Sequence, residues 1–82
     1  MKFKEKDYLK IFVDILKIKN SVKNQLHKKE LNIFLNEFNN WDSMSHVIIL
    51  TSIEKIFNIK ITHSNAKFFN NYISGLKYLK KK

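Results

Sequence analysis

The chain has 82 residues, which suits one small domain and is too short for two. It contains no cysteine, so a disulfide framework and a thiolate metal site are excluded, and its 44% hydrophobic residues suffice for a packed core. Sixteen lysines and no arginine stand against seven acids, which gives a net charge of +9.

The positive charge is concentrated in the second half of the chain. Residues 1–42 hold nine lysines and six acids, whereas residues 43–82 hold seven lysines and one acid, Glu54. A bias toward AT-rich codons explains the abundance of Lys, Asn, Ile and Phe, and the alternative is a basic surface for nucleic acid or anionic lipid. Arginine supplies most bidentate contacts to guanine and phosphate, so its absence weighs against sequence-specific nucleic-acid binding. We predict no nucleic-acid partner.

No segment has the features of a secretory signal or a membrane span. Residues 1–10 are polar, and the longest apolar run, residues 47–50, is far shorter than the ~20 residues that a span needs. We therefore expect a soluble, cytoplasmic protein with no membrane partner.

The first segment has the periodicity of an amphipathic helix. Charged residues lie opposite the apolar ones, which recur at i, i+3, i+4, i+7 and i+8: Tyr8, Ile11, Phe12, Ile15 and Leu16. This pattern predicts a helix over residues 4–19.

Residues 20–40 are polar and rich in asparagine, which is a weak helix former. Four residues within them have helix-like spacing: Leu31, Phe34, Leu35 and Phe38. We predict a long ordered loop with a short helical turn, held to the core by these Leu and Phe side chains.

A second long helix is predicted after Asp42 and Ser43, because both residue types are good N-caps. Asn58 is its predicted end. Its predicted apolar face comprises Val47, Leu50, Ile53 and Phe57, widened by Ile49 and Ile56.

The last third of the chain predicts two further helical segments. Thr62, His63 and Ser64 offer a cap for a short turn over residues 66–69. Asn70 or Asn71 then caps a final helix, in which a glycine costs about 1 kcal/mol relative to alanine. The residues of that helix expected to face inward are Tyr72, Ile73, Leu76 and Leu79.

These segments together predict an all-α fold. Amphipathic helices can bury their apolar faces only against one another, so we expect a small four-helix bundle of three longer helices and one short one, with a long first loop. We expect residues 1–82 to form a single domain and the protein to be a monomer.

The sequence offers little for catalysis or metal binding. The three histidines are scattered, and no HExxH or similar spacing joins them to a carboxylate. Ser43, His46 and Asp42 could supply a nucleophile, base and orienting group, yet they lie beside a helix start with no oxyanion-binding loop. The dispersed carboxylates form no recognised metal-ligand spacing. We expect neither an enzyme nor a metalloprotein.

The most distinctive segment is Trp41-Asp42-Ser43-Met44. Read locally, it is a helix cap with a hydrophobic contact around it. In its wider context, residues 41–47 followed by residues 53–61 resemble acyl carrier proteins. That family has Asp-Ser-Leu at the start of its second helix and Glu-x-x-Phe-x-Ile-x-Ile at the helix end; here Met44 replaces the Leu, and Glu54, Phe57 and Ile61 match.

The resemblance implies a function and a cofactor. Ser43 would carry a 4′-phosphopantetheine arm, delivered from coenzyme A by a separate phosphopantetheinyl transferase, and the arm's thiol would hold acyl groups as thioesters. Asp42 would help to orient the site. Acyl-loading and acyl-using enzymes would be the other partners, with contacts expected at Met44, Val47, Ile48, Lys55 and Ile61.

One departure from the family is electrostatic. Carriers are typically acidic and dock through carboxylates on this helix, whereas Ser45, Ile48 and Lys55 stand here where acids are common. We therefore expect dedicated partners in a specialised pathway. An aminoacyl or peptidyl carrier is an alternative, although its typical Gly-Gly-x-Ser pattern is missing, and a basic helical module that binds nucleic acid or a membrane surface is another.

Overall fold

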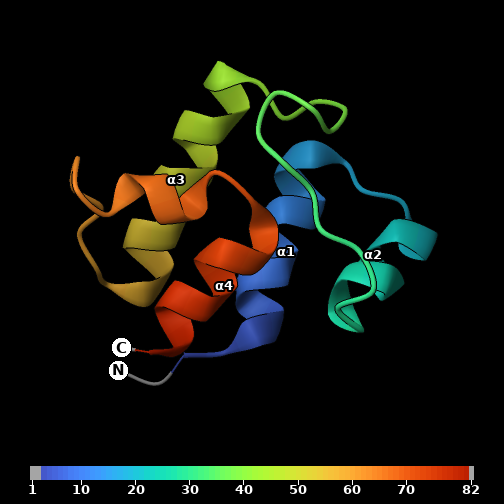
Figure 1. Cartoon of the computed structure of the whole chain (residues 1–82), viewed down its shortest axis with the longest axis horizontal. Helices are drawn as coiled ribbons and strands as arrows, with labels where there is room; N and C mark the ends of the chain where they lie inside the picture. Colours follow the sequence, from blue (N-terminus) through green and yellow to red (C-terminus); the bar gives the residue numbers. More distant parts are fainter. Residues whose placement is uncertain (1–2, 82) are drawn as a thin grey trace.

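The structure, a computed structural model, describes residues 3–81. Within them the chain forms four α-helices and one 3-10 helix, with no strand (Figure 1). The elements in chain order are α1 (Glu5–Leu16), α2 (Asn20–His27), α3 (Ser43–Phe57), η1 (Ala66–Phe69) and α4 (Tyr72–Lys80). The all-α prediction is confirmed.

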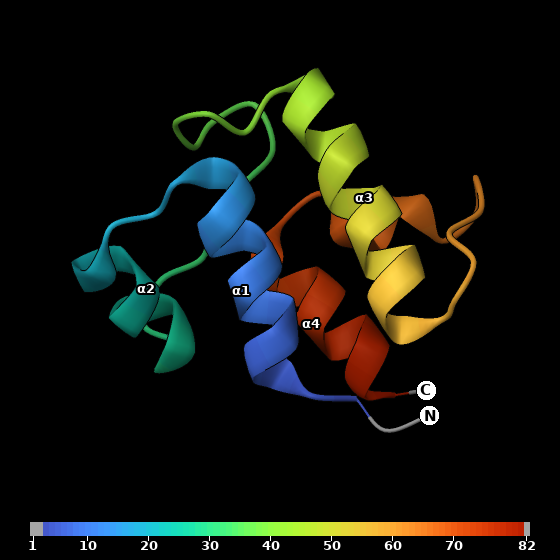
Figure 2. The same cartoon turned by 180° about the vertical axis from the view of Figure 1, so that it is seen from behind.

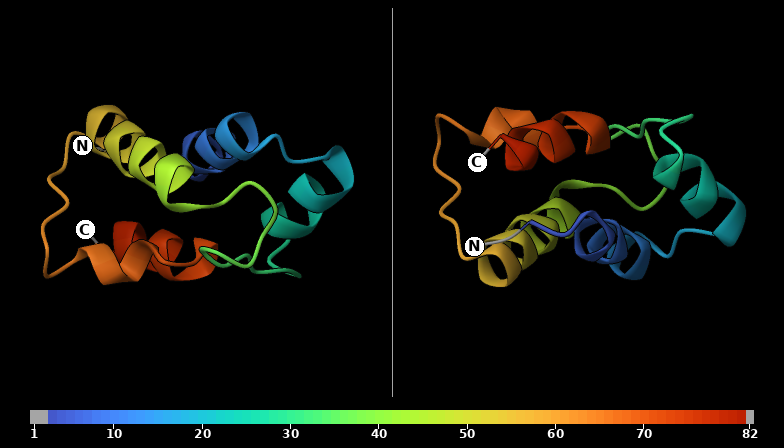
Figure 3. Two further views of the ribbon diagram at one scale, coloured as in Figure 1. Left: turned by 90° about the horizontal axis from the view of Figure 1, so that it is seen from above. Right: turned by 90° about the horizontal axis from the view of Figure 1, so that it is seen from below.

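The helices lie in two layers. α1 and α3 lie side by side in one layer, and η1 and α4 form the other (Figure 3). α2 flanks α1 on the side away from α3 (Figure 2). The Cα radius of gyration is 11.7 Å, which matches the roughly 12 Å expected of a compact chain of this length.

Aromatic side chains form the centre of the core between the layers. Tyr8 and Phe12 of α1 each contact Tyr72 of α4, with ring centroids 4.9 and 5.1 Å apart. The Tyr8 hydroxyl donates a buried hydrogen bond of 2.7 Å to the Tyr72 carbonyl oxygen. Aromatic pairs at these separations stabilise a core beyond their area burial, so this cluster joins α1 to α4.

Gly75 makes the close approach of α1 and α4 possible. A Cβ atom at this position would meet the Tyr8 hydroxyl and the Phe69 ring. The glycine thus weakens α4 locally while allowing the two layers to pack.

The prediction of one long loop over residues 20–40 is wrong in its first part, because α2 occupies Asn20–His27. Leu26 is fully buried against the core, and tertiary packing of this kind overrides the low helix propensity of the two asparagines. The connection is therefore shorter than predicted and spans residues 28–42. Within it, the antiparallel bridge between Phe34 and Asn71 fixes the segment to the start of α4.

The helix boundaries agree with the predicted ones in two places and differ from them in two. Asn58 ends α3 in the left-handed conformation (φ 53°), and Asn71 caps α4 by accepting the Ser74 N–H. α1 ends three residues earlier than predicted, because Lys17 adopts φ 55°. Asn65, rather than residues 62–64, is the N-cap of η1, and its side chain accepts from the Thr62 N–H.

Within the described residues, no helix combines the length and the apolar character required to cross a membrane.

Candidate functional site

Ser43 is the first residue of α3, and this helix meets the long connection at the top of Figure 1. The residue is exposed. Among residues 3–81 the structure gives its side chain no hydrogen bond, so the hydroxyl is accessible and unengaged. The sequence prediction of an exposed serine at a helix start agrees with this placement.

Asp42 and Ser45 hold this helix start in place. The Asp42 carboxylate accepts the Ser45 N–H at 3.0 Å, and the Ser45 hydroxyl oxygen accepts the Asp42 N–H at 2.9 Å. The backbone N–H of Ser45 is the main reason that the pKa of Asp42 is lowered. This reciprocal pair is a capping box, which satisfies two N–H groups that the helix itself leaves free.

The two serines of the first turn therefore differ in what their hydroxyls can do. Ser45 also donates to the Asn40 carbonyl oxygen at 2.6 Å, so its hydroxyl is fully used in joining α3 to the connection. Ser43 takes no part in this network. Of the two hydroxyls, the one on Ser43 is available to react.

Trp41 anchors the other side of the helix start. Its side chain is 1% exposed and meets the Phe12 ring edge-on at 5.3 Å. The indole N–H donates to Nδ1 of His46 at 3.1 Å. Burial lowers the pKa of His46, which favours the neutral imidazole that can accept this bond.

Four of the predicted contact residues lie on one exposed face of α3. At 100° per residue, Met44, Val47, Ile48 and Lys55 fall within an arc of about 100°. Met44 is 79% exposed, Val47 61% and Ile48 53%, and Lys55 is also exposed. Three large apolar side chains are thus exposed in the two turns of α3 that follow Ser43, and Lys55 lies two turns beyond Ile48.

The core-facing side of α3 is narrower than predicted. Ile49, Ile53 and Phe57 are buried, at i, i+4 and i+8, whereas Val47 and the 48%-exposed Ile56 lie outside the core. The predicted apolar face therefore divides: Ile49, Ile53 and Phe57 pack into the core, whereas Ile56 and Val47, which was also predicted as a partner contact, are exposed. α3 carries apolar residues on nearly every side, so periodicity alone does not identify the side that packs.

Ile61 lies apart from this face. It follows the end of α3, its side chain is half-buried, and its backbone N–H donates to the Glu54 carboxylate at 2.8 Å. The structure therefore groups Met44, Val47, Ile48 and Lys55 on α3 and leaves Ile61 in the segment that follows it.

Sequence reasoning missed the roles of Ser45 and His46. A serine three residues after an N-cap aspartate is the available signal for the capping box. No comparable signal identifies His46, because its pairing with Trp41 depends on how the connection approaches the helix.

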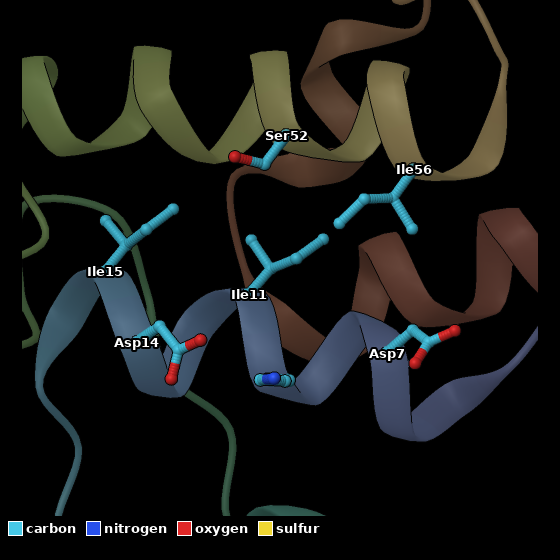
Figure 4. Close-up of a pocket in the computed structure, with 7 residues that line it drawn as sticks. Asp7, Ile11, Asp14, Ile15, Ser52 and Ile56 are labelled. Carbon is cyan, nitrogen blue, oxygen red and sulfur yellow. The ribbon is translucent and has the colours of Figure 1, made fainter.

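A shallow hollow of about 440 Å³ lies between α1 and α3. Figure 4 shows Ile11 and Ile15 of α1 directed toward α3, with Ser52 and Ile56 directed back toward them. Asp7, Lys10 and Asp14 form its polar edge. Acidic and basic side chains alternate along this edge.

The described residues contain no group of three or more His, Cys, Asp or Glu side chains that could hold a metal ion. Ser43, Asp42 and His46 lie within one turn, but the imidazole Nδ1 binds the Trp41 indole and the Asp42 carboxylate binds Ser45. The side chains of His46 and Asp42 therefore hold the helix start in place.

Comparison of the chain with protein-family models, with curated proteins and with solved structures finds no match.

Proposed function

We propose that the chain is an acyl carrier protein in which Ser43 carries a 4′-phosphopantetheine arm. The observation that supports this most is the exposed and unengaged Ser43 hydroxyl at the first position of α3, beside a helix start held by Asp42 and Ser45. A carrier needs such a hydroxyl, because a separate enzyme must reach it and attach a bulky group.

The residues around Ser43 fit the group. In the attachment reaction, the Ser43 oxygen bonds to a phosphorus of coenzyme A, the bond to the departing nucleotide phosphate breaks, and a base of the transferase takes the hydroxyl proton. The N-terminal end of α3 favours the negative phosphate that remains on Ser43. The thiol of the bound arm supplies the acyl-transfer chemistry. Asp42 keeps Ser43 at the helix start and presents it to the transferase.

In this proposal the all-α fold is the four-helix bundle of a carrier, with α1, α3, η1 and α4 as its helices and α2 as an addition in the first connection. The protein acts in the cytoplasm as a monomer and holds acyl groups for a specialised biosynthetic pathway.

The exposed face of α3 is the proposed partner surface. Met44, Val47 and Ile48 offer apolar contact beside the arm, and Lys55 adds positive charge. Complementarity of charge governs encounter rate and partner choice, so acyl-loading and acyl-using enzymes with apolar, uncharged or acidic docking sites fit this surface best. Ile61 is proposed as a further contact.

The decisive experiment is intact-mass analysis after incubation with coenzyme A and a broad-specificity phosphopantetheinyl transferase. We expect wild type to gain one phosphopantetheine and Ser43→Ala to gain none. Ser64→Ala is a matched control, since Ser64 is also an exposed serine, and it is expected to react as wild type does. If several transferases leave the wild type unchanged, the proposal is wrong.

The aminoacyl or peptidyl carrier alternative shares the same attachment chemistry. Loading of the modified protein with acyl or aminoacyl groups by the corresponding enzymes separates the two.

A second candidate function rests on charge. Within the described part of the chain no carboxylate follows Glu54, and a hollow between η1 and α4 is lined by Phe68, Tyr78, Lys77 and Lys81 among others. Lysines beside the partly exposed rings of Phe68 and Tyr78 suit a basic module for nucleic acid or an anionic membrane surface. Such binding would survive Ser43→Ala and weaken steeply as salt rises, because counterion release drives it.

A further inference from the structure

The pairing of Trp41 with His46 depends on the charge of His46. The indole N–H is a donor only, so its partner must supply a lone pair. Nδ1 supplies it at 3.1 Å, which requires the neutral imidazole with its hydrogen on Nε2. Protonation would place a hydrogen on Nδ1, and two N–H groups would then face each other.

Loss of this partner is unfavourable in free energy for the indole N–H. Trp41 is 1% exposed, so water does not readily replace the imidazole, and an unpaired buried donor is costly. The neighbouring ring of Phe12 offers no acceptor lone pair in its edge-on geometry. Protonated His46 and the buried indole are therefore incompatible in this arrangement.

The pair lies at the same helix start as Ser43. Trp41 precedes the cap residue Asp42, and the backbone N–H of His46 bonds to the Asp42 carbonyl oxygen at 2.9 Å. Two side chains of the first turn thus join α3 to the connection, Ser45 through Asn40 and His46 through Trp41. If the bond between Trp41 and His46 is lost, only the bond from Ser45 to Asn40 remains of these two.

Burial, and not the charge of neighbouring residues, is the dominant influence on the pKa of His46. The charged residues on the segments around the pair include Asp42 at the helix start, Asp14 on α1, Lys17 just after α1, and Glu37 in the connection. All four are exposed, so water screens them. Burial is the cause of the lowered pKa, and the hydrogen bond from Trp41 acts in the same direction because only the neutral ring accepts it.

We infer that Trp41 and His46 form a pH-sensitive latch that holds the start of α3 to the connection while His46 is neutral and releases it when His46 is protonated. The latch is a property of the fold and is independent of what Ser43 carries. Released, the first turn of α3 and its Ser43 are more mobile.

The test uses the fact that Trp41 is the only tryptophan, so its indole N–H gives one NMR signal. The imidazole of His46 and the indole N–H of Trp41 are followed in wild type from pH 8 to pH 5. We expect both signals to change with one midpoint, below the ordinary histidine value of about 6.5. His46→Gln keeps an acceptor oxygen and does not titrate, so its indole signal should stay constant.

Hydrogen exchange at the indole N–H measures the release. The ratio of the exchange rate in wild type to that in His46→Gln at the same pH cancels the intrinsic pH dependence of exchange. We expect this ratio to rise about tenfold between pH 7 and pH 5, as loss of one partly buried hydrogen bond would give. A double variant, His27→Gln with His63→Gln, should behave as wild type.

An indole signal that does not change while His46 titrates in wild type would overturn the inference. This measurement needs no variant, so it decides the question even if His46→Gln fails to fold. A change that persists in a folded His46→Gln would overturn it equally.

Discussion

Asp42 and Ser45 cap α3 reciprocally, each accepting the backbone N–H of the other at 3.0 and 2.9 Å. Ser43 lies between them and contributes nothing to the cap. This arrangement separates the residue that can react from the residues that hold the helix start, and it predicts different outcomes for neighbouring serine substitutions.

Ser45→Ala is expected to lower the free energy of unfolding by about 1 kcal/mol. It removes the hydroxyl that accepts the Asp42 N–H and donates to the Asn40 carbonyl oxygen. Ser43→Ala, at an exposed position with no hydrogen bond, should change it by less than about 0.5 kcal/mol. Urea unfolding followed by circular dichroism measures both. Equal losses in the two variants would contradict the assignment of the cap to Ser45.

Glu5 is expected to make stability depend on pH in the acid range. Its carboxylate bonds to Lys29 at 2.8 Å and pairs with Lys80 at 3.3 Å, and the hydrogen bond from Lys29 is the main cause of its lowered pKa. A carboxyl group with a lowered folded pKa stabilises the fold above its unfolded value of about 4.3. This contribution is lost as pH falls from there through the folded pKa.

Glu5→Gln should therefore be less stable than wild type at pH 7, by roughly 0.5 kcal/mol for a partly exposed pair. The difference should disappear at a pH below the folded pKa. Thermal unfolding across this range is the measurement, with Glu37→Gln, an exposed acid, as control. A stability difference that stays constant with pH would argue against the ion pairs.

Gly75→Ala is expected to destabilise the protein by about 1–3 kcal/mol, although alanine favours helices by about 1 kcal/mol. The added Cβ would meet the Tyr8 hydroxyl and the Phe69 ring, so these buried side chains or the segments that carry them must shift. Chemical unfolding measures the loss.

A double-mutant cycle with Tyr8→Phe tests the cause. Tyr8→Phe alone costs about 1 kcal/mol, since the Tyr72 carbonyl oxygen loses its buried donor. Combined with Gly75→Ala it should cost less than the sum of the two, because one obstructing atom is gone. Strict additivity would show that the hydroxyl is not the obstruction.

The charge on the exposed face of α3 predicts that the enzymes of a general fatty-acid synthase act poorly on this protein. We expect the phosphopantetheine-bearing protein to be elongated more slowly than that system's own acidic carrier. Ile48→Glu combined with Lys55→Glu should raise the rate roughly tenfold at low salt, since charge complementarity acts mainly on association. Initial rates of elongation measure this, with Lys23→Glu combined with Gln25→Glu on α2 as a charge-matched control. Wild type elongated as fast as the native carrier would refute the prediction.

Local signals account for what could be predicted. The periodicity of α1 and the residues Asn58 and Asn71 predicted an element and two helix ends correctly, because spacing and capping act within a few residues of the chain. The exposed position of Ser43 followed from the same reasoning.

The sequence by itself thus determined that the chain is helical, where most of its helices lie, and that a serine stands at the start of α3. Tertiary structure decided that residues 20–27 form α2, since burial of Leu26 outweighs weak propensity. It also selected Ile49, Ile53 and Phe57 as the buried side of α3, left Met44, Val47 and Ile48 exposed, and brought His46 to Trp41. These outcomes depend on which surfaces meet, and a helix with apolar residues on nearly every side leaves that choice to its neighbours.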